Sequence, residues 1–454
     1  MMIGKYRIKG LLGKGGMGRV YKVELPEIGK IAALKLLLPH EHMVSLLGAE
    51  EVERMFLSEA RILGRLRHPN VASILDFDRD QHERPFFVME YHCMNLGAMI
   101  GEHYEMEKPT RTMDPARSFR YCRQVLAGLD RLHHAGILHR DIKPYNVLIT
   151  ETDEARLIDF GLSHLRGETG TVPETFKVGT PYYAAPEQQS DPDSADPRAD
   201  LYGAGVLMWR LLTGYLPPET GSRPRPGAVN SILGVCWDEF LLKSVSPDPE
   251  KRFAGSMEMM DALDDSHRQW SKNLEQACRL QPPRDARQNG AEKQDRRSLR
   301  KTPLKVAVKN ARDVFGLDFQ YRPAAVKTGR FEHAGSKLAR DSVHGLLWNK
   351  SATRYPVDWH EAHRHIEFLN SFGFAGIRSW RLATVDELAS LIRQASVLGD
   401  YCVSPLFDPG KQRLWSADRK SYTSAWFVDT ELGYVGSADF TCLCHVRAVS
   451  DEAC

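Results

Sequence analysis

A glycine-rich segment near the N-terminus constrains the fold most, because it stands between two strand-like segments. Its glycines are Gly13, Gly15 and Gly18, in the spacing Gly-x-Gly-x-x-Gly. A dinucleotide-binding fold needs a helix directly after such glycines, but the sequence from Val20 to Leu25 alternates as a strand does. The glycines therefore lie at the tip of a predicted hairpin, where backbone N–H groups can approach phosphate oxygens. A plain glycine-rich turn is the alternative interpretation of this segment alone.

Lys35 follows within an apolar segment, from Ile31 to Leu36, that is predicted to be another strand. A buried lysine is costly without a partner. Glu59 lies in the next segment, from Glu51 to Leu66, whose apolar residues have helical spacing. The sequence therefore predicts that Glu59 supplies the carboxylate for Lys35.

Two later loops place carboxylates beside other polar groups. The first reads His-Arg-Asp-Ile-Lys-Pro-Tyr-Asn and contains Asp141, Lys143 and Asn146. In the second, Asp159 follows a short apolar strand and precedes Phe-Gly, and an Ala-Pro-Glu motif ends at Glu187. The loops thus offer two carboxylates, an ammonium and an amide.

The ordered motifs resemble those of the bacterial eukaryotic-like serine/threonine protein kinase family, over about residues 3 to 265. The resemblance implies an α+β fold with two lobes, strand-rich and then helix-rich. It also implies transfer of the γ-phosphate of ATP to serine or threonine of proteins, including autophosphorylation. Asp200 resembles the start of the helix that anchors the catalytic loop, and Arg252 resembles the late arginine that pairs with Glu187. A catalytically weak pseudokinase scaffold carrying a binding module is the alternative.

The resemblance assigns roles to individual residues. The implied catalytic residues are Asp141, Lys143, Lys35 and Glu59. The implied nucleotide-binding residues are Gly13, Gly15, Gly18, Val20, Lys35, Glu90, Tyr91, Cys93, Asn146 and Asp159. Asn146 and Asp159 would hold Mg²⁺, with Mn²⁺ as an alternative ion. Asp141 would accept the proton of the substrate hydroxyl, and Lys143 would neutralise the γ-phosphate.

Arg140 beside Asp141 predicts regulation, because an arginine there needs an anionic partner and kinases that carry it are often switched by phosphorylation. Thr171 or Thr175 is the expected phosphorylation site. The resemblance implies instead that Thr180 hydrogen-bonds Asp141 and Lys143.

Composition changes after about Trp270. Residues 271–312 contain 12 Lys and Arg against 4 Asp and Glu, which predicts a basic linker. The expected domains are a kinase domain at 1–270, a linker at 271–325 and a second folded domain at 326–454. The whole chain, with 61 Lys and Arg against 59 Asp and Glu, has a net charge of +2, which argues against non-specific binding of nucleic acid.

The second domain resembles the Lcl C-terminal domain family over about residues 338 to 449. The motifs that carry the resemblance end or begin at Trp348, Trp359, Trp380-Arg381-Leu382, Trp415, Trp426 and His445-Val446-Arg447. The family implies a C-type-lectin-like α+β fold that binds a ligand and does not catalyse. The tryptophans are expected to fill a small core. Thr384 is expected to cap a helix at 385–392, with Glu387 completing a capping box.

Three further hypotheses concern the second domain. A metal site is one, either at His360, His363 and Glu367, which share a helical face, or at Cys442-x-Cys444-His445, which lacks a second ligand pair. A binding surface diversified by retroelements, from Trp415 to Cys444, is another. The third, suggested by a related fold that houses a copper-dependent oxidase, is a second enzyme at Cys402, Cys442 and Cys444.

Targeting features are sparse. There is no run of 18 apolar residues and no apolar core of a signal peptide at the N-terminus. Eight cysteines are too few for a disulfide scaffold. The sequence therefore predicts a cytoplasmic protein without a membrane span. The expected partners are protein substrates, an unidentified ligand of the second domain and a second copy of the chain for trans-autophosphorylation.

Overall fold

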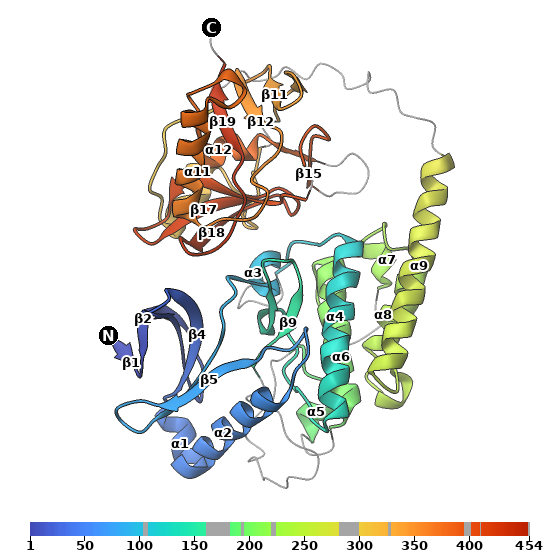
Figure 1. Ribbon diagram of the computed structural model, residues 1–454. Helices are drawn as coiled ribbons and strands as arrows, with labels where there is room; N and C mark the ends of the chain where they lie inside the picture. The colour runs from blue at the N-terminus through green and yellow to red at the C-terminus, as the bar shows by residue number, and fades with distance from the viewer. Residues whose placement is uncertain are drawn as a thin grey trace. The chain divides into compact units, whose positions relative to one another are not determined.

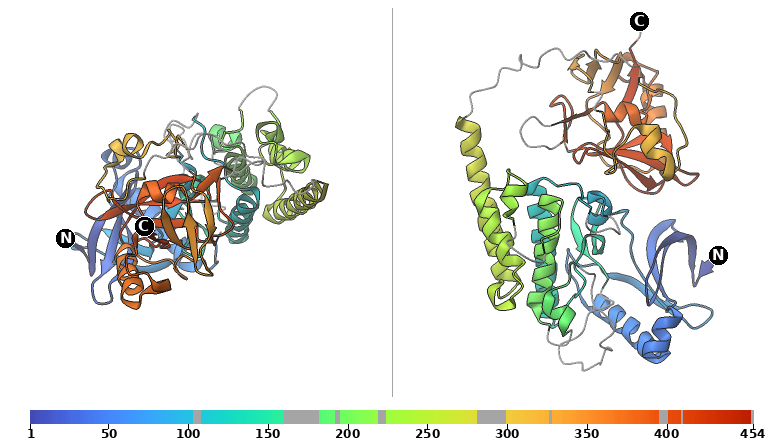
Figure 2. Two further views of the ribbon diagram at one scale, coloured as in Figure 1. Left: turned by 90° about the horizontal axis from the view of Figure 1, so that it is seen from above. Right: turned by 180° about the vertical axis from the view of Figure 1, so that it is seen from behind.

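The computed structural model describes residues 1–102, 108–159, 182–191, 195–218, 224–280, 299–325, 328–394, 401–408 and 410–452. The chain divides into two compact units, Met1–Gln276 and Ala277–Cys454, shown as ribbons in Figures 1 and 2. Each unit has a buried hydrophobic core of its own.

The first unit opens with an antiparallel sheet of six strands in the order β1–β2–β3–β4–β6–β5. The strands are β1 (Met2–Ile3), β2 (Tyr6–Lys14), β3 (Gly18–Leu25), β4 (Lys30–Leu37), β5 (Ile74–Arg79) and β6 (Pro85–Glu90). Val23, Leu34 and Phe86 are fully buried on one face of this sheet. The predicted alternation in β3 is therefore that of a strand with one face in the core.

The other face of the sheet carries Lys35 and its cross-strand partner Phe87. Helix α2 (Ala49–Arg65), which follows the short helix α1 (Glu41–Leu47), packs on this face, with the rings of Phe56 and Phe87 5.1 Å apart. Glu59 lies one turn after Phe56 on the same helix, so it faces the sheet as well.

The rest of the first unit is mainly helical (Figure 1). Its helices are α3 (Leu96–Ile100), α4 (Pro115–His134), α5 (Pro186–Ser190), α6 (Pro197–Thr213), α7 (Pro226–Val229), α8 (Gly234–Ser244) and α9 (Ser256–Leu280). Two 3-10 turns lie at Pro144–Asn146 and Pro249–Lys251. Helix α6 is buried from Ala199 to Thr213, as expected for a helix that is apolar all round.

A small antiparallel sheet in this lobe brings the two polar loops together. Its strands are β7 (Met94–Asn95), β8 (Val147–Ile149) and β9 (Ala155–Leu157), in that order. Asn146 directly precedes β8, and Asp159 comes two residues after β9 ends. Because β8 and β9 are paired, the two loops lie at the same edge.

The described residues of the second unit form three separate sheets. The first has the order β10 (Phe331–His333), β11 (Leu338–Asp341), β12 (Leu346–Asn349), β19 (Ala448–Asp451) and β13 (Arg381–Leu382). The others are β16 (Arg413–Arg419), β17 (Ser424–Asp429) and β18 (Tyr434–Asp439), and the pair β14 (Ile392–Gln394) and β15 (Tyr401–Val403). The helical elements are α10 (Val308–Phe315), α11 (Trp359–Phe372), α12 (Val385–Ala389) and a 3-10 turn at Phe374–Gly376.

Two expectations about the second unit are confirmed. Trp348, Trp415 and Trp426 are completely buried, as expected for core residues. Thr384 and Glu387 form a capping box at the start of α12. This helix ends at Ala389, earlier than expected, because the chain enters strand β14 at Ile392.

The expected domain boundaries differ from the structure. Helix α9 continues to Leu280, ten residues beyond the expected end of the first domain. Residues 299–325, assigned to the linker, contribute Leu299, Val306, Ala311, Phe315 and Leu317 to the core of the second unit. Apolar side chains spaced among the basic residues are buried there, so this part of the expected linker is folded.

Within the described ranges, every helix is either too short or too polar to cross a membrane.

Candidate functional site

The glycine-rich turn joins β2 to β3, with a hydrogen bond of 2.8 Å from the N–H of Gly15 to the carbonyl of Gly18. A Cβ added at Gly18 would lie 2.2 Å from the carbonyl oxygen of Leu36, so the sheet itself requires glycine there. An added Cβ would meet no atom within 4 Å at Gly13, and at Gly15 only one, at 3.9 Å. The fold therefore fixes Gly18, whereas Gly13 and Gly15 leave the backbone open to a ligand.

Lys35 lies between two carboxylates. Its Nζ is 2.7 Å and 2.9 Å from the two carboxylate oxygens of Glu59, and 3.2 Å from Oδ1 of Asp159. Burial alone would lower the pKa of Lys35, but the charges of Asp159 and Glu59 outweigh burial and hold it above its usual value. In turn, the charge of Lys35 lowers the pKa of Asp159. Lys35 and Asp159 are therefore both charged at neutral pH.

Asp141 forms a second cluster with Lys143 and Asn146. Nζ of Lys143 lies 2.7 Å from Oδ2 of Asp141. The amide nitrogen of Asn146 donates to the same oxygen at 2.9 Å and to the backbone carbonyl of Asp141 at 2.8 Å. The carboxylate of Asp141 thus has a fixed direction.

Asp200, in the first turn of α6, holds the start of this loop. Its carboxylate, which is almost fully buried, accepts hydrogen bonds from the N–H of His139 (2.9 Å) and of Arg140 (2.7 Å), and lies 2.8 Å from Nε2 of His133. Burial alone would raise the pKa of Asp200, but these contacts lower it.

The backbone of the site departs from ordinary geometry at two residues. Arg140 (φ 66°) and Asp159 (φ 68°) both adopt the left-handed region, which is unfavourable for a residue with a side chain. Such residues cluster at functional sites, where the surrounding structure holds them in place. Asp200 supplies that restraint for Arg140.

Four further residues expected to bind the nucleotide lie in β3 and at or just after the end of β6. Val20 is paired with Lys35 across β3 and β4. Glu90 ends β6 and forms an ion pair with Arg156. Tyr91 and Cys93 lie between β6 and β7, and Nζ of Lys22 is 5.0 Å from the centre of the Tyr91 ring.

Glu187 and Arg252 form a bidentate ion pair, with distances of 2.6 Å and 2.8 Å, and the Arg252 side chain is fully buried. The expected regulatory residues come between Asp159 and Glu187 in the sequence. Thr171, Thr175 and Thr180 all fall outside the described residues, as do the Phe and Gly that follow Asp159.

Sequence reasoning missed two residues that contact the site. His133 shares the carboxylate of Asp200, and Arg156 pairs with Glu90. Each lies more than 60 residues from its partner, so no local spacing could have indicated the contact. The apolar periodicity of α4 indicates only that His133 lies near the end of that helix.

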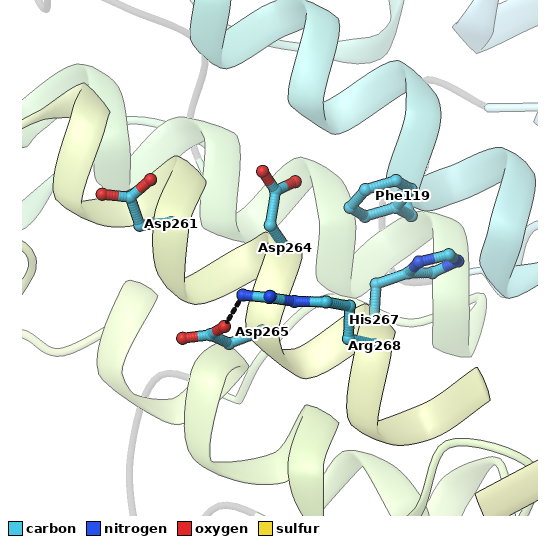
Figure 3. Close-up of a pocket in the computed structure, with 6 residues that line it drawn as sticks. All are labelled: Phe119, Asp261, Asp264, Asp265, His267 and Arg268. Carbon is cyan, nitrogen blue, oxygen red and sulfur yellow. Dashed lines mark hydrogen bonds and ion pairs between the residues drawn. The ribbon is translucent and has the colours of Figure 1, made fainter. Parts of the chain in front are cut away.

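A separate hollow of about 620 Å³ lies between α4 and α9. Figure 3 shows its lining, in which the ring of His267 stacks on Phe119 and Arg268 reaches Asp265. Asp264 is paired with Arg123 at 2.9 Å. The hollow shares no lining residue with the two clusters around Lys35 and Asp141.

The candidate ligands in the second unit are involved in packing. His363 lies edge-on to Trp359 at 4.2 Å between ring centres. Burial raises the pKa of Cys444 to about 12, which disfavours the thiolate that a metal needs. Nδ1 of His445 lies 2.9 Å from the carbonyl of Thr353. Over the described part of the chain, no three His, Cys, Asp or Glu side chains converge as a metal site would require.

Comparison with known proteins gives two family matches. Residues 6–254 match the protein kinase domain, and residues 337–450 match the Lcl C-terminal domain.

Two curated relatives are kinases from bacteria. The serine/threonine-protein kinase pkn3 of Myxococcus xanthus is 36% identical over 277 residues, which cover 56% of this chain and 48% of that protein. The serine/threonine-protein kinase PknE of Mycobacterium tuberculosis is 33% identical over 263 residues, which cover 55% of this chain and 44% of that protein. The chain therefore spans about half the length of these relatives.

Among solved structures, the kinase domain of Mycobacterium tuberculosis PknI matches with a TM-score of 0.45 and 25% identity, covering 59% of this chain and 97% of that one.

Proposed function

Because this chain belongs to the protein kinase family, we propose that it is a serine/threonine protein kinase that transfers the γ-phosphate of ATP to proteins, itself included. The observation that carries the proposal is the contact of Lys35 with both Glu59 and Asp159, beside a separate cluster that directs Asp141. Phosphoryl transfer depends mainly on positioning and on neutralising charge. Both clusters supply these functions.

The nucleotide would lie between the two lobes. Gly13 and Gly15, whose backbone is open, would cover the phosphates, and Gly18 would set the shape of the turn. Lys35 would hold the α- and β-phosphates while Glu59 keeps its ammonium in place. Val20, Glu90, Tyr91 and Cys93 would contact the adenine.

The Asp141 cluster would act on the acceptor hydroxyl. Asp141 would accept its proton, because a carboxylate aimed by two neighbours can receive a proton without reorganising. Lys143, a lysine two residues beyond the catalytic aspartate, favours serine or threonine as the acceptor and would neutralise the γ-phosphate.

Asn146 and Asp159 would hold Mg²⁺, or Mn²⁺ in its place. Both residues offer the hard oxygen ligands that Mg²⁺ prefers. Because the amide nitrogen of Asn146 is bonded to Asp141, its amide oxygen is the atom that can face a cation. The metal, when bound, would neutralise charge on the phosphates.

A pseudokinase scaffold is the second candidate. The presence of Lys35, Asp141, Asn146 and Asp159 in two ordered clusters argues against it, since a scaffold has no need of this charge arrangement.

For the second unit we propose a C-type-lectin-like module that binds a ligand or recruits substrates. The burial of Trp348, Trp415 and Trp426 supports a packing role for these residues. Any diversified surface between Trp415 and Cys444 would therefore have to use side chains of this stretch other than the buried tryptophans.

An ATP-dependent kinase needs the nucleotide pool of the cytoplasm, where we place the protein. Trans-autophosphorylation would need a second copy of the chain.

The test is incubation of the full-length chain with Mg²⁺ and ATP labelled at the γ-phosphate, followed by identification of the phosphorylated amino acid. Asp141→Asn should abolish incorporation. Asp130→Asn, at a partly exposed position of α4, is the matched control and should retain it. Labelled serine or threonine that depends on Asp141 supports the proposal. Folded protein that gives no label, or label that survives in Asp141→Asn, would contradict it.

A further inference from the structure

Tyr145 occupies a place in the catalytic loop that no role in the proposed reaction explains. It lies in the 3-10 turn Pro144–Asn146, between two residues that bond Asp141. The residue as a whole is 42% exposed. Whatever fixes this turn also fixes the direction of the Asn146 amide.

The side chain of Tyr145 contacts helix α3 and the residue two positions after its end. Its ring lies against Gly97, where an added Cβ would be only 2.7 to 2.9 Å from three ring atoms. Its hydroxyl donates a hydrogen bond of 2.7 Å to the carbonyl of Glu102, two residues after α3 ends. Only glycine at position 97 permits this approach.

Glu102 in turn connects α3 to α6. Its carboxylate is fully buried and lies 3.2 and 3.3 Å from two guanidinium nitrogens of Arg210. Arg210 also donates to the carbonyls of Gly214 and Lys108. A buried pair with these extra hydrogen bonds is firmly held.

Helix α6 therefore holds the catalytic loop at both ends. Asp200, in its first turn, bonds the N–H groups of His139 and Arg140 directly. Arg210, in its last turn, reaches the other end of the loop through Glu102 and Tyr145. The two attachment points are ten residues apart, or about 15 Å along a helix axis.

We propose that Tyr145 is a positioning residue that attaches the C-terminal end of the catalytic loop to α6, and so fixes the Asn146 amide and the carboxylate of Asp141. The role in catalysis rests on the proposed kinase function, whereas the attachment itself does not. A residue with this role affects the chemical step and the metal requirement more than the affinity for ATP, because Lys35 belongs to the other lobe.

The first measurement is hydrogen–deuterium exchange on the full-length chain, which needs no activity. Tyr145→Ala should accelerate amide exchange of residues 143–147 about tenfold. The N–H of Asn146 donates to the carbonyl of Lys143, and this hydrogen bond is lost when the turn opens. Residues 139–141, held by Asp200, should stay within about twofold. Gly97→Ala should reproduce the pattern by displacing the ring. Tyr215→Ala, at another exposed tyrosine, is the matched control and should change neither segment.

The second measurement is the kinetics of phosphoryl transfer. Tyr145→Ala should lower kcat about tenfold and raise the Mg²⁺ concentration for half-maximal rate about threefold, with KM for ATP within about twofold. Tyr145→Phe keeps the ring and loses one hydrogen bond, so its kcat and its Mg²⁺ requirement should lie between those of the wild type and those of Tyr145→Ala.

Unchanged exchange at residues 143–147 in Tyr145→Ala would overturn the attachment. Faster exchange with unchanged kcat and Mg²⁺ requirement would overturn the positioning role. If the wild-type chain shows no activity that depends on Asp141, the proposed kinase function fails, and the exchange experiment still decides the attachment.

Discussion

Asp200→Asn should destabilise the first unit and impair catalysis without altering any residue that contacts substrate. The buried carboxylate accepts two backbone N–H groups and lies beside His133. Asparagine keeps one oxygen but presents an NH₂ group to donors that need an acceptor. Hydrogen bonds to a charged group are worth about 1.5–3 kcal/mol each, and one to two would be lost, so we expect a loss of about 1.5–6 kcal/mol. At about 2 °C per kcal/mol for a unit of this size, that lowers Tm by about 3–12 °C.

The stability that Asp200 contributes should fall at low pH. The folded-state pKa of Asp200 is lowered, so its contribution is present above the unfolded pKa of about 3.9 and is lost as pH falls through the folded value. The difference in stability between the wild type and Asp200→Asn should therefore shrink as the pH falls below about 4.

The assay is urea unfolding of the full-length chain, read separately for each unit, with kcat measured beside it. Asp196→Asn is the matched control, because Asp196 caps the same helix from a partly exposed position and asparagine is an equally good N-cap, so the change should cost less than about 1 kcal/mol. If Asp200→Asn costs no more than the control, or if its effect is unchanged at pH 3.5, the reasoning is refuted.

Three other predictions follow from single contacts. Gly18→Ala should lower Tm by several degrees, because the sheet has no room for a Cβ, whereas Gly15→Ala should leave Tm unchanged and weaken ATP binding. Calorimetry measures both quantities, and equal effects of the two variants would contradict the distinction between a structural Gly18 and an open Gly15. Glu59→Gln should lower kcat by about 10- to 100-fold, because Lys35 keeps Asp159 but loses the charge of its other, buried partner; steady-state kinetics measure this, and an unchanged kcat would contradict it. Arg300→Ala should cost the second unit about 3–5 kcal/mol, because Asp418 is fully buried and bonded to both guanidinium NH₂ groups; its unfolding transition should shift while that of the first unit stays in place.

The elements of the site could be predicted because each is encoded locally. The turn glycines precede a strand pattern, and Asp141, Lys143 and Asn146 lie within six residues of one another. Contacts across long separations could not be predicted in this way. Tyr145 and Glu102 are 43 residues apart in the sequence. Their contact depends on how α3 packs, which no local pattern specifies.

The expected linker shows where composition misleads. Residues 299–325 are rich in Lys and Arg, which favours a solvated segment. Phe315 is nevertheless buried against Trp426, with ring centres 5.4 Å apart, and the indole N–H of Trp426 donates to the carbonyl of Val306. Arg300 is paired inside the domain with Asp386 and Asp418. A few apolar residues at suitable spacing were enough to fold this basic segment, because its charged groups form ion pairs within the domain.

The double contact of Lys35 makes nucleotide binding an exchange of partners and not a simple addition. Lys35 already satisfies Asp159, so phosphates that approach the ammonium compete with that carboxylate. A nucleotide that brings a divalent cation offers Asp159 a replacement for the charge it gives up, whereas a metal-free nucleotide leaves the carboxylate facing the phosphates with like charge. If the chain binds ATP as proposed, the same salt bridge would therefore favour the metal-loaded form of the nucleotide.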